Sequence, residues 1–111
     1  MTNRVIVQHA ARMDILDVYS RAAANAPVAA EKWLDRVTAT LHTLNENPQR
    51  CPLAFENNKV VVELRELLFG KRPNVFRIVF AMDGQTARVL RFLRGQRRYL
   101  TPEQIAEALD D

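Results

Sequence analysis

The chain has 111 residues, of which 48% are hydrophobic and 26% are charged. This length and composition are typical of one soluble globular domain that buries a core without disulfides or a metal, so we expect a single domain over residues 1–111. One cysteine excludes an internal disulfide, and two distant histidines without a second cysteine exclude a zinc set, so we expect neither a metal nor another cofactor. No apolar signal region opens the chain and no apolar run approaches membrane-spanning length, which predicts a cytoplasmic protein with no membrane partner.

The positive charge is concentrated in one part of the chain. Residues 59–99 hold ten Lys/Arg against three Asp/Glu, whereas residues 1–58 hold six of each sign and residues 100–111 hold four acids and no base. A small domain with so concentrated a positive field is suited to an anionic partner. The pattern therefore predicts binding to nucleic acid, to a ribosome or to an acidic protein segment.

The N-terminal half reads as one strand followed by two helices. A β-branched run at residues 5–7 indicates a first strand, and apolar residues recur at helical spacing over residues 10–24. Pro27 ends that helix and opens the next, which continues to Asn47 and Pro48. The second helix has the clearest apolar stripe in the chain: Ala30, Leu34, Val37, Leu41 and Leu44. With so short a connection the two helices should form an antiparallel hairpin whose stripe lies on a sheet.

The C-terminal half reads as three strands and a short helix. We expect strands over residues 60–69, 75–80 and 86–93, with turns at residues 70–74 and at Asp83-Gly84. Thr101 and Pro102 are typical of the first positions of a helix. The predicted fold is α+β in the order β-α-α-β-β-β-α, with the helical hairpin packed on a mostly antiparallel sheet.

Strand alternation predicts where the arginines point. Phe76, Ile78, Phe80 and Met82 share one face of a strand, which we interpret as the core face, so Arg77 points to the opposite, outer face. If the Asp83-Gly84 loop has three residues, Arg77 lies directly opposite Arg91, and the two could clamp an anion. With Leu64 on the core face, Glu63 and Arg65 would join Arg77 on the outer face. The residues predicted to bind a target or partner are Arg77, Arg91, Arg94, Arg97, Arg98 and Tyr99.

The alternative is a charged face that serves only solubility. Glu63 and Glu66 are equally open to two interpretations: each could be a general base, or each could pair with a nearby arginine. The sequence contains no nucleophile–base set and no phosphate-cradling glycine loop. Arginine-assisted cleavage of RNA by its own 2′-hydroxyl remains compatible with these residues, although no clear general base accompanies them.

The chain resembles the RelE/ParE superfamily of toxins from bacterial type II toxin–antitoxin systems, over about residues 4–105. The resemblance rests on the order and spacing of short motifs: DILDVY at 14–19, AAEKWL at 29–34, LNENP at 44–48, CP at 51–52, ELREL at 63–67, FRIVF at 76–80 and GQRR at 95–98. The superfamily implies a toxin that is neutralised by a cognate antitoxin. Such antitoxins are acidic segments that fold on binding, and the hairpin groove or the basic face would receive this one.

The resemblance leaves two targets open. The RelE-like branch cleaves messenger RNA in the ribosomal A site, whereas the ParE-like branch lacks most nuclease residues and poisons DNA gyrase. The helical hairpin and residues 44–52 look ParE-like, and Glu63 and Arg65 stand where RelE has lysines. On the nuclease alternative Arg65, Arg77 and Arg97 would be catalytic and Glu63 a candidate base; the ending at residues 100–103 also resembles HigB-like nucleases. We expect a gyrase inhibitor first, a ribosome-dependent endoribonuclease second, and a non-toxic RNA-binding domain third.

Overall fold

A computed structural model describes residues 2–95 and 99–110 of the chain. The observed elements are β1 (Arg4–Val7), α1 (His9–Asn25), α2 (Pro27–His42), β2 (Glu63–Lys71), β3 (Asn74–Asp83), β4 (Thr86–Arg94) and α3 (Pro102–Leu109). Three short 3₁₀ helices, η1 (Thr43–Asn45), η2 (Pro48–Arg50) and η3 (Phe55–Lys59), occupy the segment between α2 and β2. This order confirms the predicted α+β fold. No helix within these ranges is long and apolar enough to cross a membrane.

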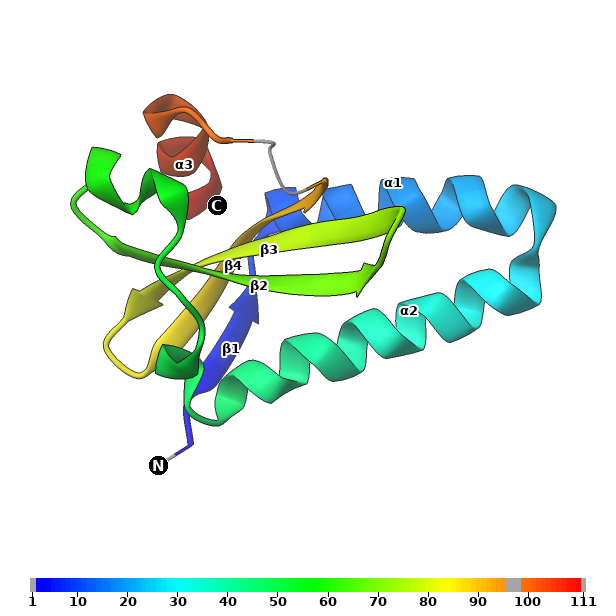
Figure 1. The fold of residues 1–111 in the computed structure, drawn as a ribbon, viewed down its shortest axis with the longest axis horizontal. Helices are drawn as coiled ribbons and strands as arrows, with labels where there is room; N and C mark the ends of the chain where they lie inside the picture. Colours follow the sequence, from blue (N-terminus) through cyan, green and yellow to red (C-terminus); the bar gives the residue numbers. More distant parts are fainter. Residues whose placement is uncertain (1, 96–98, 111) are drawn as a thin grey trace.

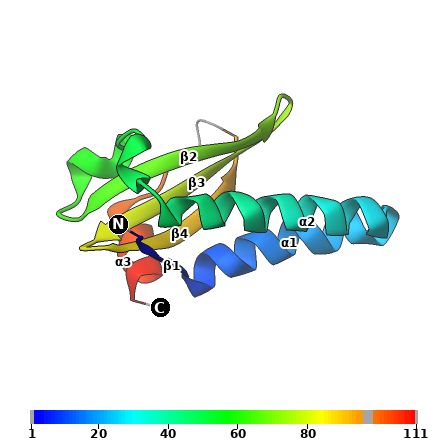
Figure 2. The ribbon, with the colours of Figure 1, turned by 90° about the horizontal axis from the view of Figure 1, so that it is seen from below.

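The four strands form one sheet in the order β1-β4-β3-β2. β1 runs parallel to β4, and the other two neighbouring pairs are antiparallel, as expected for a mostly antiparallel sheet. Helices α1 and α2 form the expected antiparallel hairpin, and Figures 1 and 2 show it lying along one side of the sheet. The two edges of the sheet are β1 and β2.

The helical hairpin and the sheet enclose the first hydrophobic core. The apolar stripe of α2 supplies Val37 and Leu41 to this core, and Ala30 of the same stripe is also buried. Trp33 lies edge-on to three phenylalanine rings of the sheet, with centroid distances of 6.2 Å to Phe69, 5.8 Å to Phe76 and 5.9 Å to Phe92. Such edge-to-face pairs add to the free energy gained by burial and fix the position of the helix over the strands.

The opposite face of the sheet is also buried, which the sequence analysis did not predict. A second core forms there between the strands, residues 54–64 and α3; its buried members are Ala54, Leu64, Val79, Ala81, Leu90, Leu93, Leu100, Ile105 and Ala108. Helix α3 begins as predicted: Gln104 N–H donates to Thr101 Oγ1 at 3.1 Å, and Thr101 N–H donates back to the Gln104 side chain at 2.8 Å. The middle of β3 is therefore covered on both faces, and its outward-pointing residues Arg77, Val79 and Ala81 are buried.

The predicted register of β3 and β4 is wrong. Asp83 pairs with Thr86, so the loop has two residues, and a β-bulge between Val79 and Phe80 shifts the pairing once more. As a result Arg77 lies opposite Leu93, and Arg91 lies opposite Val79. The arginine clamp across these strands does not exist, because the loop is shorter than expected and the bulge adds a residue to β4.

The predicted face of β2 is also wrong. Leu64 pairs with Ala81 and belongs to the second core, so Glu63 and Arg65 fall on the side of the helical hairpin, away from Arg77. β2 itself begins at Glu63 and not at residue 60, and Val61 is fully exposed. The error arose because a second core offered Leu64 a burial site that the sequence pattern alone did not reveal.

Candidate functional site

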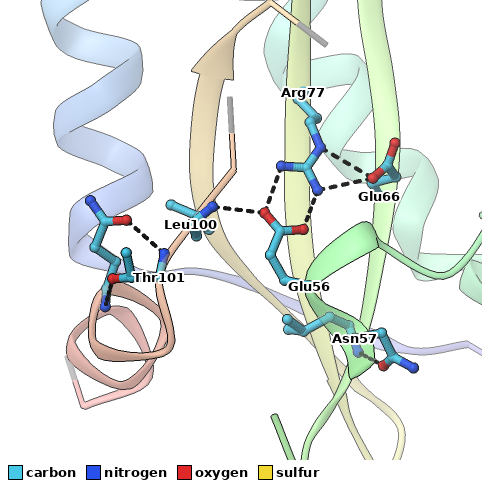
Figure 3. A network of polar contacts seen from close by, with 8 residues as sticks. Glu56, Asn57, Glu66, Arg77, Leu100 and Thr101 are labelled. Atoms are coloured by element: carbon cyan, nitrogen blue, oxygen red, sulfur yellow. Dashed lines mark hydrogen bonds and ion pairs between the residues drawn. The ribbon is translucent and has the colours of Figure 1, made fainter. Parts of the chain in front are cut away.

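Arg77 is the centre of a buried ionic network. Its side chain comes from the middle of β3 and has no solvent exposure. The guanidinium donates two hydrogen bonds to Glu56, one of them from Nη1 to Oε2 at 2.9 Å. It also donates to Glu66 Oε1 from Nε at 3.1 Å and from Nη2 at 3.0 Å. Figure 3 shows both carboxylates converging on the one guanidinium.

Glu56 links this network to the C-terminal segment. Its Oε2 also accepts a hydrogen bond of 2.9 Å from the Leu100 N–H, just before α3 (Figure 3). Burial alone would raise the pKa of Glu56, but hydrogen bonds from Arg77 and Leu100 outweigh it and hold the pKa below its ordinary value. The pKa of Arg77, which burial would lower, is raised by Glu56 and Glu66. Glu56 and Arg77 are thus both charged, and each satisfies the other.

A stacked aromatic pair lies over the network at the surface. The rings of Phe55 and Tyr99 stack with centroids 4.3 Å apart, and the Arg77 guanidinium lies 5.5 Å from the Tyr99 centroid. The ammonium of Lys59 lies 5.0 Å from the Phe55 centroid. Phe55 and Tyr99 remain about half exposed, at 53% and 49%. This exposed pair, held from below by a rigid network, is a candidate contact surface for a target protein.

Arg65 is bound on the other side of β2. Its Nε donates to Glu63 Oε2 at 2.7 Å, and its Nη1 donates to the carbonyls of Cys51 at 2.6 Å and Gln49 at 3.2 Å. The ion-pair interpretation of the two glutamates is therefore confirmed: Glu63 pairs with Arg65, and Glu66 pairs with Arg77. The structure does not bring Arg65 and Arg77 together.

The remaining predicted residues are dispersed. Arg91 forms a two-point ion pair with Asp14 of α1, at 2.7 and 3.0 Å, and this carboxylate raises the pKa of Arg91 above its ordinary value. Arg94 donates to the Asn74 side chain at 2.9 Å and lies over the Phe76 ring. Arg97 and Arg98 lie outside the described residues.

The sequence analysis missed Glu56 and Phe55 altogether. Both lie in η3, within a segment that carries no alternating or helical pattern and was interpreted as a loop. Asp14 was likewise not recognised as the partner of Arg91, since 77 residues separate the two. The only sequence signal for Glu56 was that an acidic residue lies in a predicted loop just before the arginine-rich strands.

An apolar groove lies between the helical hairpin and the β1 edge of the sheet. It has a volume of about 360 Å³ and its walls come from β1, α1 and α2: Val5, Val7, Arg12, Ile15, Leu16, Leu34, Val37, Thr38, Leu41 and His42. Arg12 and His42 are its charged or ionisable members. β1, which contributes Val5 and Val7 to this groove, is an edge strand, so one side of its backbone has no neighbouring strand in the sheet.

The described residues offer no metal centre. No three side chains of His, Cys, Asp or Glu among them lie close enough to hold an ion. Burial raises the pKa of the Cys51 thiol above its ordinary value, which disfavours the thiolate that would bind a metal or act as a nucleophile.

Comparison with known proteins places the chain in a family. No curated protein sequence matches it. One solved structure, described as the chromosomal ParDE TA system from P. aeruginosa, superimposes with a TM-score of 0.68 at 18% identity, over 86% of this chain and 98% of the other, which shows a shared fold. A family model described as ParE toxin of type II toxin–antitoxin system, parDE, matches residues 5–99. The chain therefore belongs to the ParE toxin family and is the toxin component of a type II toxin–antitoxin system.

Proposed function

We propose that this toxin inhibits DNA gyrase and does not cleave RNA. The separation of Arg65 from Arg77 is the observation that supports this most. The two arginines lie on opposite faces of the sheet, and each is held by a carboxylate. Cleavage of a phosphodiester would need cationic groups that converge on one phosphate, with a general base within reach.

Glu63, the candidate general base, is also held in an ion pair. Glu63 is the ion-pair partner of Arg65, at 2.7 Å, and is separated from Arg77 by the thickness of the sheet. A nuclease that used Arg77 would first have to break the buried ion pair between Arg77 and Glu56, which is costly because the desolvated charges would lose their partners. Inhibition of a protein target needs no such rearrangement, since it requires only an exposed contact surface.

We further propose that the cognate antitoxin occupies the apolar groove beside β1. The groove offers aliphatic walls for the apolar face of an amphipathic segment. Arg12 on α1 and the net positive charge of the protein favour an acidic partner. An antitoxin segment that orders on binding would gain affinity from the apolar walls and would associate quickly through charge complementarity.

A supercoiling assay with purified gyrase tests the proposed function. Added toxin should inhibit supercoiling or trap cleaved DNA on gyrase, and toxin premixed with antitoxin should not. In parallel, messenger-RNA ends are mapped in a reconstituted translation reaction that contains the toxin. Cuts at the A-site codon together with uninhibited gyrase would reject the proposal in favour of the ribosome-dependent nuclease.

A further inference from the structure

A second groove lies between α2 and the end of the β2–β3 hairpin, at the other edge of the sheet. It has a volume of about 610 Å³ and is lined by Trp33, Arg36, Phe69, Gly70, Lys71 and Asn74. Trp33 and Phe69 are only partly exposed, because their rings pack edge-on against each other and belong to the first core. Arg36 and Lys71 are exposed and supply positive charge from two different elements.

Two more arginines extend this positive surface. Arg72 lies in the turn that connects β2 and β3, and Arg94 at the end of β4 donates a 2.9 Å hydrogen bond to the groove residue Asn74. We call Arg36, Lys71, Arg72 and Arg94 the hairpin-tip cations. Within residues 2–95 and 99–110 none of the four forms an ion pair with a carboxylate, whereas the side chains of five other arginines do: Arg21, Arg65, Arg77, Arg88 and Arg91.

Asp35, the acidic residue nearest to Arg36 in the sequence, does not neutralise the charge on the groove side of α2. Asp35 precedes Arg36 on α2, but at 100° per residue it lies about 200° around the helix from Trp33. It therefore points away from the groove. The residues that line the groove thus include two cations, Arg36 and Lys71, and no carboxylate.

The backbone holds the patch in a defined shape. Gly70 has a φ of +95°, and a Cβ at this position would lie 2.3 Å from the Asn74 carbonyl oxygen, so only glycine allows this close approach of β2 and β3. Lys71 pairs directly with Asn74 at the end of the ladder. Figure 2 shows the tip of this hairpin projecting away from the helical layer, where a large partner can reach it.

We propose that the hairpin-tip cations bind the phosphate backbone of duplex DNA. This inference rests on the proposed function, because gyrase would present such a duplex to the bound toxin. Duplex DNA carries one negative charge per about 1.7 Å of helix axis, so cations spread over a projecting tip can contact several phosphates together. The toxin would then contact both the enzyme and its nucleic acid.

An acidic peptide fits this surface less well than DNA does. The two aromatic side chains of the groove are partly packed in the first core, so it offers less apolar surface to a folding peptide than the groove beside β1 does. The groove beside β1, at the opposite edge, offers that apolar surface. The two grooves thus suit different partners, and the toxin could hold its antitoxin at one edge while the hairpin tip stays accessible.

Fluorescence anisotropy with a short labelled DNA duplex tests this proposal in the absence of gyrase. Binding by the unmodified toxin should weaken as NaCl rises, with log Kd changing by roughly 0.9 per phosphate contacted for each unit of log salt concentration. Arg36→Ala, Lys71→Ala and Arg72→Ala should each lower that slope by about one and weaken binding to all sequences alike. Arg4→Ala is the matched control, since Arg4 is an exposed arginine on β1 at the opposite edge and forms no ion pair among the described residues.

The outcomes separate this inference from the function on which it rests. DNA binding that is weakened, with a lower salt slope, in each of the three variants and unchanged in Arg4→Ala supports the proposal, even if the toxin fails to inhibit gyrase. Equal loss in Arg4→Ala, no loss in the variants, or no binding at low salt overturns it, even if the toxin does inhibit gyrase. Binding of a polyglutamate peptide in place of DNA, abolished by the same three substitutions, would also overturn it and would assign the tip to an acidic protein.

Discussion

Glu56 and Arg77 form an ion pair that solvent does not reach: both side chains have an exposed fraction of zero. The two residues are 21 positions apart, on η3 and on β3. Through the Leu100 N–H, the same carboxylate also holds the segment that leads into α3. One buried pair therefore fastens three separate parts of the chain under the Phe55–Tyr99 surface.

Removal of the guanidinium should destabilise the protein strongly. Arg77→Met fills most of the same space but leaves Glu56 charged and buried without its partner, which typically costs about 3–5 kcal/mol. The free energy of unfolding from urea denaturation measures this. Arg21→Met is the matched control, because Arg21 pairs with Asp17 at the surface, and its loss should change stability by no more than about 0.5 kcal/mol.

A double substitution distinguishes a lost ion pair from poor packing of the new side chain. In Glu56→Leu/Arg77→Met no buried charge is left from the Glu56–Arg77 pair, so this protein should be more stable than Arg77→Met alone. A double variant that is less stable than Arg77→Met would show that packing and the lost hydrogen bond from the Leu100 N–H outweigh the orphaned carboxylate.

The same pair should make stability depend on pH in the acid range. The pKa of Glu56 is lower in the folded protein than in the unfolded chain, where it is about 4.3. Its contribution to the free energy of unfolding is therefore complete above about pH 4.3 and is lost as pH falls through the lower, folded-state pKa. Urea midpoints measured from neutral pH down to about pH 3 should fall less steeply for Glu56→Gln than for the unmodified protein. If the urea midpoints of the two proteins fall in parallel with pH, the pKa of Glu56 is not lower in the folded protein than in the unfolded chain.

Local sequence patterns predicted the elements of the fold because their causes are local. The apolar stripe of α2, the turn at Asp83-Gly84 and the cap at Thr101 each depend on residues a few positions apart. The partners of Arg77 do not: Glu56 lies in a 3₁₀ segment without periodicity, and the second core that buries both requires α3 to fold back onto the sheet. Alternation correctly placed Arg77 opposite the phenylalanine face but could not show that this second face is covered.

The register of the arginines was only partly predictable. The two-residue loop, Gly84 and Gln85, is a common hairpin type, whereas the bulge at Val79 and Phe80 leaves no distinctive sequence signal; each shifts the pairing by one residue. Arg91 was consequently expected to face Arg77, whereas its actual partner is Asp14 on α1. Counting charges identified the basic stretch at residues 59–99, but only the fold shows that Arg65, Arg77 and Arg91 each form an ion pair within the protein.

Leu16 should be required for binding of the antitoxin. It lines the apolar groove and is 50% exposed, so Leu16→Arg places a charge in the proposed docking site without entering the core. We expect the affinity for the antitoxin to fall at least about tenfold, or about 1.4 kcal/mol, by isothermal titration calorimetry. Met13→Arg is a close control, because Met13 is 51% exposed on the same helix and does not line the groove. Equal affinities for the two variants would place the antitoxin elsewhere.

Tyr99 should contribute to gyrase inhibition through its exposed ring. The ring is 49% exposed and is held in position by Phe55 and by the buried Arg77 guanidinium, so it is a preorganised aromatic anchor of the kind that dominates protein interfaces. Tyr99→Ala should raise the toxin concentration for half-inhibition of supercoiling about tenfold, consistent with loss of one interface anchor. Tyr99→Phe retains the stacked ring and should inhibit almost as well. Full activity of Tyr99→Ala, in a variant whose urea midpoint shows it to be folded, would remove the Phe55–Tyr99 pair from the gyrase contact and leave it a structural cover for the Glu56–Arg77 network.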